Sequence, residues 1–158
     1  MPNLLIFQIA IKPGKPFAFS KMTRSVTPNL FRGLKTRDIP IFSLPGNPVS
    51  TMVTYEELVR PAILKMMGKQ LTSLPTVKAI VQNDICKKHG RKEFLRGVFS
   101  KKNNKFFVKS VGAQGSGILK SMSKANCFIV LDEKTSLVKK GSLVNIEILN
   151  LEDSYGCN

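Results

Sequence analysis

Residues 39–68, IPIFSLPGNPVSTMVTYEELVRPAILKMMG, predict a strand, a turn and a helix in succession. The apolar stretch Ile39–Leu44 has the length of a strand, and Pro40 places it near a sheet edge or at a strand start. Asn47 suits the N-cap of the helix, and Pro48 suits its first turn because proline has no N–H to leave unpaired there. This unit indicates an α/β arrangement for the first part of the chain.

The predicted helix runs from Pro48 to about Met67, with apolar residues spaced so that they share one face. Pro61 lies inside it, and we expect a kink or a split there because proline removes a hydrogen bond and clashes with the preceding turn. Gly68 suits the C-cap, where a left-handed backbone is common.

Upstream, Leu4–Ile11 (LLIFQIAI) is almost continuously apolar, which is the pattern of a strand buried on both faces of an α/β sheet. A second short strand is predicted for Phe17–Phe19, and Ser20–Arg37 is predicted to be a long basic loop. We therefore expect residues 1–70 to form the end of an α/β domain.

Residues 76–151 have a different pattern, because short segments of alternating polarity follow one another after a polar linker at 71–75. Asn103-Asn104 predicts a hairpin turn, since asparagine tolerates a positive φ. Closely spaced strands of this kind predict a small β-barrel or sandwich, followed by a tail at 152–158. The predicted elements are strands at Val77–Val81, Phe94–Phe99, Phe106–Val111, Cys127–Leu131 and Leu143–Leu149, and a short helix at about Gly117–Lys124.

The chain is strongly basic, with 25 Lys and Arg residues against 10 Asp and Glu and a formal net charge of +15. At 42% hydrophobic residues it is too apolar for a disordered polycation. The charge indicates anionic partners, such as nucleic acid, phosphorylated small molecules or oxyanions, or else a solvated basic face. Nucleic acid is disfavoured, because the basic runs lack interleaved aromatic residues and contain no known reader motif.

The three cysteines, Cys86, Cys127 and Cys157, are odd in number and far apart. That pattern fits neither a disulfide framework nor a CxxC metal site, and it indicates a reducing compartment. His89 is the single histidine, which argues against a zinc site held by the protein. The longest apolar stretch is far shorter than the roughly 20 residues of a membrane helix, so we expect a soluble, cytoplasmic protein without a membrane partner.

The segment Lys12-Pro13-Gly14-Lys15-Pro16 is a first candidate anion site. Pro13 and Gly14 predict a type II turn, in which the flanking Lys12 and Lys15 have Cα atoms within about 7 Å of each other. The ammonium groups of both lysines then project from one rigid turn that follows a strand, and open α/β sheets bind ligands at such strand ends. A simple surface hairpin is the alternative.

The segment Leu44–Ser50 is a second candidate. Pro45 and Gly46 predict another type II turn, after which the helix begins with free N–H groups beside the hydroxyl of Ser50. A helix start of this kind can bind an anion, although ordinary strand-turn-helix geometry explains the same pattern.

A glycine-rich loop, Gly112–Gly117 (GAQGSG), is a third candidate, and it is neither a Walker A nor a Rossmann motif. It either cradles a phosphate or is a flexible hairpin exit. Arg96, alone among apolar residues of a predicted strand, either faces outward or binds a ligand. No catalytic Ser/His/Asp or Cys/His set can be assembled, so the catalytic residues stay unknown and no metal ligands are predicted.

Five segments together resemble the molybdopterin molybdenumtransferase (MoeA) family, whose eukaryotic relatives include the gephyrin E domain. The segments occur in the family's order and spacing, and LPGNPVS followed by VRPA is specific. They are AIKPGKPFAF (10–19), FSLPGNPVSTMVTYEELVRPAILKMMG (42–68), GRKEFLRGVF (90–99), GAQGSGILKSMSKANCFIVL (112–131) and KKGSLVNIEIL (139–149).

The resemblance implies molybdenum cofactor synthesis, in which molybdate is inserted into adenylylated molybdopterin and AMP is released in a magnesium-dependent reaction. It implies that residues 1–70 end a molybdopterin-binding α/β domain and that residues 76–151 are the family's C-terminal β-barrel. The residues that would bind molybdate or the pterin substrate are Lys12, Lys15, Pro16, Pro45, Pro48, Ser50, Arg96 and Ser116.

The chain also departs from the family pattern. The acidic TSGG-type motif that precedes the opening strand in family members is absent, and no carboxylate occurs before Asp38 although Mg²⁺ needs oxygen ligands. The resemblance is therefore to a C-terminal portion, which we expect to act as a homodimer or with a companion chain rather than alone. A non-catalytic scaffold built on the basic barrel is the second hypothesis, and non-specific nucleic-acid binding is the third.

Overall fold

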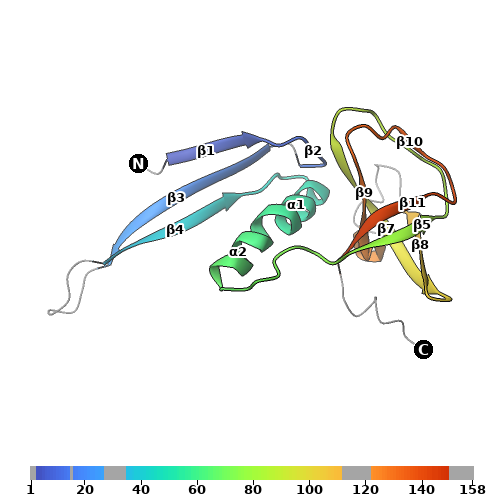
Figure 1. The fold of residues 1–158 in the computed structure, drawn as a ribbon. Helices are drawn as coiled ribbons and strands as arrows, with labels where there is room; N and C mark the ends of the chain where they lie inside the picture. Colours follow the sequence, from blue (N-terminus) through green and yellow to red (C-terminus); the bar gives the residue numbers. More distant parts are fainter. Residues whose placement is uncertain (1–2, 15, 27–34, 112–121, 150–158) are drawn as a thin grey trace.

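The structure of the chain, a computed structural model, describes residues 3–14, 16–26, 35–111 and 122–149. A sheet and a helical rod form a first module, and a second module consists mainly of strands (Figure 1). The elements of the first module are strands β1 (Asn3–Gln8), β3 (Pro16–Val26) and β4 (Lys35–Ser43) and the helical segments α1 (Pro48–Thr54), η1 (Tyr55–Val59) and α2 (Arg60–Met66).

The second module is a closed β-barrel. Its strands pair in the order β7-β8-β5-β11-β9, and a further pairing of β7 with β9 closes the ring. All these pairs are antiparallel except β5 with β8. The bounds are β5 (Thr76–Val81), β7 (Lys92–Lys102), β8 (Lys105–Ser110), β9 (Cys127–Leu131) and β11 (Leu143–Ile148), and the short strands β6 (Ile85–Cys86) and β10 (Leu137–Val138) pair beside them.

The barrel confirms the sequence-based prediction for this half of the chain. Each predicted strand is present, because alternating residues place one apolar side inward. Ala79, Val108 and Ile146 are buried at the centre of the barrel core. The predicted hairpin turn is also confirmed, since Asn103 and Asn104 have φ values of 48° and 60°.

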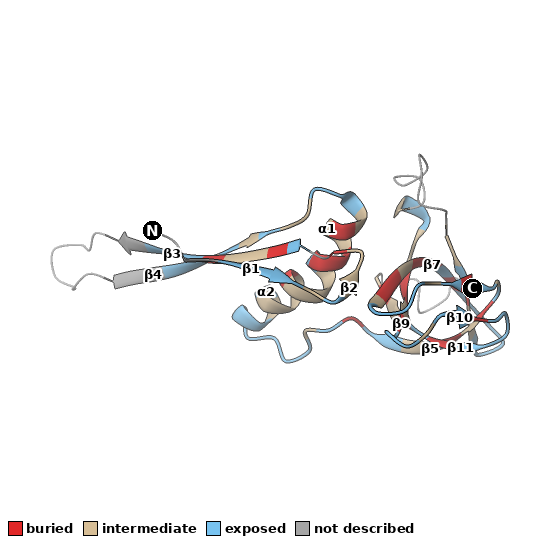
Figure 2. Cartoon of the chain, turned by 90° about the horizontal axis from the view of Figure 1, so that it is seen from above, coloured by how far each residue is buried: buried red, intermediate tan, exposed pale blue. Residues whose placement is uncertain are grey.

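The first module differs from the predicted α/β piece. Its three strands form an antiparallel sheet in the order β1-β3-β4. The prediction that Leu4–Ile11 is buried on both faces is wrong, because Leu5, Ile6 and Phe7 are all exposed, Ile6 by 70% (Figure 2). Successive side chains point to opposite faces, so the described residues cover neither face of this edge strand.

The predicted loop Ser20–Arg37 is also wrong over most of the described part. β3 continues to Val26 and β4 begins at Lys35, and the two pair in a long antiparallel ladder that extends beyond the helices (Figure 1). Lys21 forms a 2.5 Å ion pair with Asp38, which also accepts a 2.8 Å hydrogen bond from Thr23 Oγ1. The polar composition predicts a loop, whereas in the structure the polar residues stabilise the ladder by pairing across it.

The helix runs through the predicted Pro48–Met67 region but changes type along its length. The π-helical turn η1 precedes Pro61, which lies in the first turn of α2. The split of the helix that was predicted near Pro61 therefore takes the form of a π-helical turn between α1 and α2. The C-cap is Met67, and Gly68 follows it with φ +77°, so the predicted glycine with a left-handed backbone lies one residue beyond the cap.

The described helices are all too short to span a membrane. Of the predicted helix at Gly117–Lys124, residues 122–124 are helical and the rest lies outside the described residues. The predicted boundaries at 70, 75 and 151 stay predictions.

Gly97→Ala should destabilise the barrel by about 1–3 kcal/mol, because overpacking a closed core forces its neighbours to move. A Cβ at Gly97 would lie 2.9 Å from Cys127 Sγ and 3.0 Å from both Ile129 Cγ1 and Val108 Cγ2. Urea unfolding measures the loss. Gly46→Ala is the control, since a Cβ added at Gly46 would meet no atom within 4 Å and the φ of Gly46 is not positive. Equal stability of the two variants would contradict the packing described for β7.

Candidate anion-binding cavity

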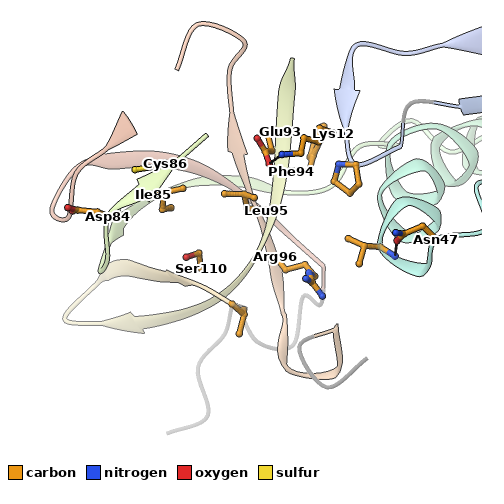
Figure 3. A pocket seen from close by; sticks show the side chains of 13 residues that line it. Lys12, Asn47, Asp84, Ile85, Cys86, Glu93, Phe94, Leu95, Arg96 and Ser110 are labelled. Carbon is orange, nitrogen blue, oxygen red and sulfur yellow. Dashed lines mark hydrogen bonds and ion pairs between the residues drawn. The ribbon is translucent and has the colours of Figure 1, made fainter. Parts of the chain in front are cut away.

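A cavity of about 390 Å³ lies between the first module and the barrel (Figure 3). Lys12 and Asn47 line it from the first module, and Glu93, Arg96 and Ser110 line it from the barrel. Two of the eight predicted site residues, Lys12 and Arg96, are thus brought to one cavity from distant parts of the sequence.

Lys12 reaches the cavity because β2 (Ile11–Lys12) pairs in parallel with the start of β7. Lys12 lies opposite Glu93, and its Nζ forms a 2.9 Å ion pair with Glu93 Oε1. The Glu93 side chain is 5% exposed and that of Lys12 is 35% exposed. The ammonium charge is therefore balanced by a buried carboxylate.

The turn after Lys12 packs on helix α1. Gly14 has φ +124°, and a Cβ there would lie 2.7 Å from Thr54 Cγ2, so only glycine fits without a shift. The Lys12–Pro13 peptide bond is cis, whereas the predicted type II turn has a trans bond at this place. Lys15 lies outside the described residues, so the predicted pairing of Lys12 with Lys15 stays a prediction.

The start of α1 confirms Asn47 as the N-cap and Pro48 as the first helical residue. Asn47 Oδ1 accepts hydrogen bonds from Val49 N at 3.0 Å and Ser50 N at 3.4 Å. The N–H groups at the helix start, which were predicted to be free for an anion, are therefore already hydrogen-bonded to the side-chain oxygen of Asn47. The type II turn predicted for Pro45 and Gly46 is wrong, since Gly46 does not have a positive φ.

Arg96 lies on β7, opposite Phe128 of β9, and only 7% of the residue is exposed. Its side chain extends from the barrel toward α1, where Asn47 lies (Figure 3). Burial lowers the pKa of its guanidinium, which nevertheless stays charged in proteins. Of the two alternatives left open by the sequence, the structure places Arg96 at the cavity.

The other predicted site residues are elsewhere. Pro16 and Pro48 are exposed, Pro45 is half-buried and Ser50 is buried, and none of these lines the cavity. Ser116 and the Gly112–Gly117 loop lie outside the described residues. Their part in binding stays a prediction.

The sequence analysis overlooked the acidic residues of the cavity, Glu93 and Asp84. Asp84 Oδ1 accepts a 2.7 Å hydrogen bond from Lys140 N. Glu93 lies within the GRKEFLRGVF segment, three residues before Arg96, but its pairing with Lys12 is non-local and has no sequence signature. Within the described lining, two carboxylates therefore balance two cationic groups.

No three His, Cys, Asp or Glu residues of the described chain are grouped so that they could hold a metal ion. The described residues thus do not fit the Mg²⁺ that the resemblance implies. Cys86 and Cys127 are free thiols, and burial raises the pKa of Cys127 to about 12. Cys127 is consequently an inert core residue, and Cys157 lies outside the described part.

Comparison with known proteins confirms the resemblance. Residues 78–149 match the MoeA C-terminal region (domain IV). The chain is 41% identical over 146 residues to a molybdopterin molybdenumtransferase of Haemophilus influenzae, covering 91% of this chain and 33% of that protein. It is 37% identical over 148 residues to gephyrin of Dictyostelium discoideum, covering 87% of this chain and 20% of that protein.

A solved structure agrees with these relatives. The molybdopterin biosynthesis MoeA protein of Pyrococcus horikoshii has a TM-score of 0.66 and 31% identity, covering 93% of this chain and 32% of that one. The chain spans about a third of the length of this structure and of the Haemophilus protein.

A double-mutant cycle of Lys12→Met and Glu93→Gln should give a coupling free energy of about 1–3 kcal/mol in urea unfolding, because either single change leaves a charge or acceptor near the cavity without its partner. The exposed pair Lys21–Asp38 is the matched control, with Lys21→Met and Asp38→Asn expected to couple by about 0–1 kcal/mol. Similar coupling in both cycles would show that burial of Glu93 does not strengthen the cavity pair.

Proposed function

Because residues 78–149 belong to the MoeA C-terminal region (domain IV) and the chain is a relative of molybdenum cofactor biosynthesis proteins, we propose that it takes part in inserting molybdate into adenylylated molybdopterin with release of AMP. In this proposal the chain is the C-terminal portion of a transferase and supplies anion-binding groups. The supporting observation is the meeting of Lys12 and Arg96 at one cavity between the modules.

The chemistry of the cavity suits an oxyanion. Molybdate is a dianion, and the pterin substrate carries phosphate, so both need several N–H donors. Arg96 offers a forked set of donors from a buried position, where electrostatic attraction is stronger than in water. Glu93 takes one donor of the Lys12 ammonium and fixes its direction, which leaves further donors for a ligand.

The remaining predicted residues complete the proposal. Lys15, Pro16 and Ser116 would add contacts to the anion, and Pro45, Pro48 and Ser50 would shape the pterin end. The described carboxylates do not form a Mg²⁺ site, so no step is assigned to that ion. We also propose a cytoplasmic location, in agreement with the free thiols of Cys86 and Cys127.

A partner polypeptide is part of the proposal, either a second copy or a companion chain. β1 is an edge strand of the described sheet and exposes apolar residues on both faces. An uncovered apolar edge strand is a template for pairing with another chain.

A non-catalytic scaffold is the second candidate, favoured by exposed apolar residues at the end of the helical rod. Met66, Met67 and Leu71 are each more than half exposed, and Leu71 is 88% exposed. A scaffold would use such a surface for a protein partner, without molybdate binding.

Calorimetric titration of the purified chain with molybdate at physiological salt tests the proposed function. We expect saturable binding that sulfate does not reproduce. Arg96→Ala should weaken it roughly ten- to a hundred-fold, the worth of a charged hydrogen bond. Arg91→Ala removes the same charge from an exposed position outside the cavity and should bind like the wild type. Equal affinities of the two variants would contradict a role for Arg96, and absence of binding by the folded chain would favour the scaffold.

Sedimentation measurements test the exposed strand. We expect the wild-type chain to self-associate and Ile6→Lys to shift it toward monomer, because a charge at the centre of β1 opposes burial of that strand. Leu143→Lys changes a residue of similar exposure, 63%, on the barrel and serves as control. A wild-type chain that stays monomeric at high concentration would contradict pairing between copies and leave a companion chain as the partner.

A further inference from the structure

Two carboxyl groups meet where the helical rod contacts the barrel. Glu57 of the π-helical turn η1 and Glu147 of strand β11 line the same small cavity, where their side chains interact. A carboxylate can only accept, so a hydrogen bond between two carboxyl groups requires that one of them carries a proton. Burial and the neighbouring Glu147 raise the pKa of Glu57 from 4.5 to about 8.

The surroundings make loss of this proton costly. The pair borders a cavity of about 80 Å³ closed by the rod, the linker and the barrel, to which Glu56 adds a third carboxyl group. Glu147 Oε2 and Glu56 Oε2 are both buried without a hydrogen-bond partner. Two ionised groups at this place would repel each other in a medium less polar than water.

The charged groups that face the pair are few. On the rod, Arg60 Nε lies 3.6 Å from Glu56 Oε2. On the barrel, Lys92 of β7 attracts the ionised form of Glu57 and only partly offsets the effect of burial. The linker contributes Ser73 and Leu74, which do not ionise. The three carboxyl groups thus outnumber the two cations.

The contact joins the same two modules that form the large cavity. Val53 of α1 packs with Phe94 and Phe128 of the barrel, and β2 pairs with β7. Lys12 and Arg96 lie on opposite sides of this junction. The distance between the cavity walls consequently depends on how firmly the rod is held to the barrel.

We propose that the proton shared by Glu57 and Glu147 is a latch between the rod and the barrel, and that its loss releases the rod and opens the cavity. The latch goes beyond the proposed function and does not depend on it. In the released state Glu57 is solvated and its pKa returns to its ordinary value of 4.5. The latched state is therefore fully favoured below about pH 4.5 and loses its advantage as the pH rises toward about 8, where the latched pair itself ionises.

Hydrogen exchange of one amide reports on the latch without any ligand. Lys92 N donates a 3.1 Å hydrogen bond to Ala10 O across the junction, whereas Val81 N bonds to Ser142 O inside the barrel. We expect the protection factor of Lys92, corrected for the intrinsic effect of pH, to fall by up to about tenfold per pH unit from pH 6 to 8 and then level off. Val81 should keep its protection.

Glu57→Gln and Glu147→Gln each remove one of the two carboxyl groups while preserving side-chain shape. Either variant should make the Lys92 protection factor independent of pH between 6 and 9. Glu133→Gln, on an exposed loop of the barrel, should keep the wild-type profile. The same pH profile in the wild type and in both latch variants would overturn the proposal, as would a wild-type profile for Lys92 that follows Val81. Molybdate titration is independent of these results, so the latch and the proposed function can fail separately.

Discussion

The parallel pairing of Lys12 with Glu93 is the constraint on which the cavity depends. It covers only two residues of β2, yet it attaches the first module to the rim of the barrel. Glu93 is almost completely buried, and a buried carboxylate without a cation is strongly unfavourable. If Lys12 left this position, the buried carboxylate of Glu93 would lose its cation. The pairing therefore fixes one wall of the cavity relative to Arg96, which the closed barrel holds on the other wall.

The barrel could be predicted from the sequence because its information is local. Each strand shows alternation, and Asn103-Asn104 marks its turn through a backbone conformation that asparagine tolerates. The N-cap Asn47 and the left-handed backbone of Gly68 after the helix were predictable for the same reason. Features of this kind need only a few neighbouring residues, and tertiary contacts did not override them.

The errors concern residues whose partners are distant or absent. An apolar run such as Leu4–Ile11 predicts a strand, but which of its faces another segment covers is decided only by the tertiary fold. The polar composition of the β3 and β4 arms predicts a loop, because the ion pair between Lys21 and Asp38 that stabilises the ladder forms only in the folded chain. In the cavity, Lys12 and Arg96 were predicted through motifs, whereas Glu93 as their counter-charge was not, since its pairing arises only in the folded chain.

The net charge of +15 does not by itself account for the proposed anion binding, because the described lining of the cavity balances Lys12 and Arg96 with Asp84 and Glu93. Selectivity must then come from donor geometry, which depends on the relative position of the two modules. Glu93 stabilises that position through an ion pair and, in the proposed latch, Glu57 stabilises it through a proton. An anion that bridges the modules would favour the same latched state. Thermodynamic linkage requires this coupling to be reciprocal, so the bridging anion would strengthen proton binding by the same factor by which the proton strengthens anion binding.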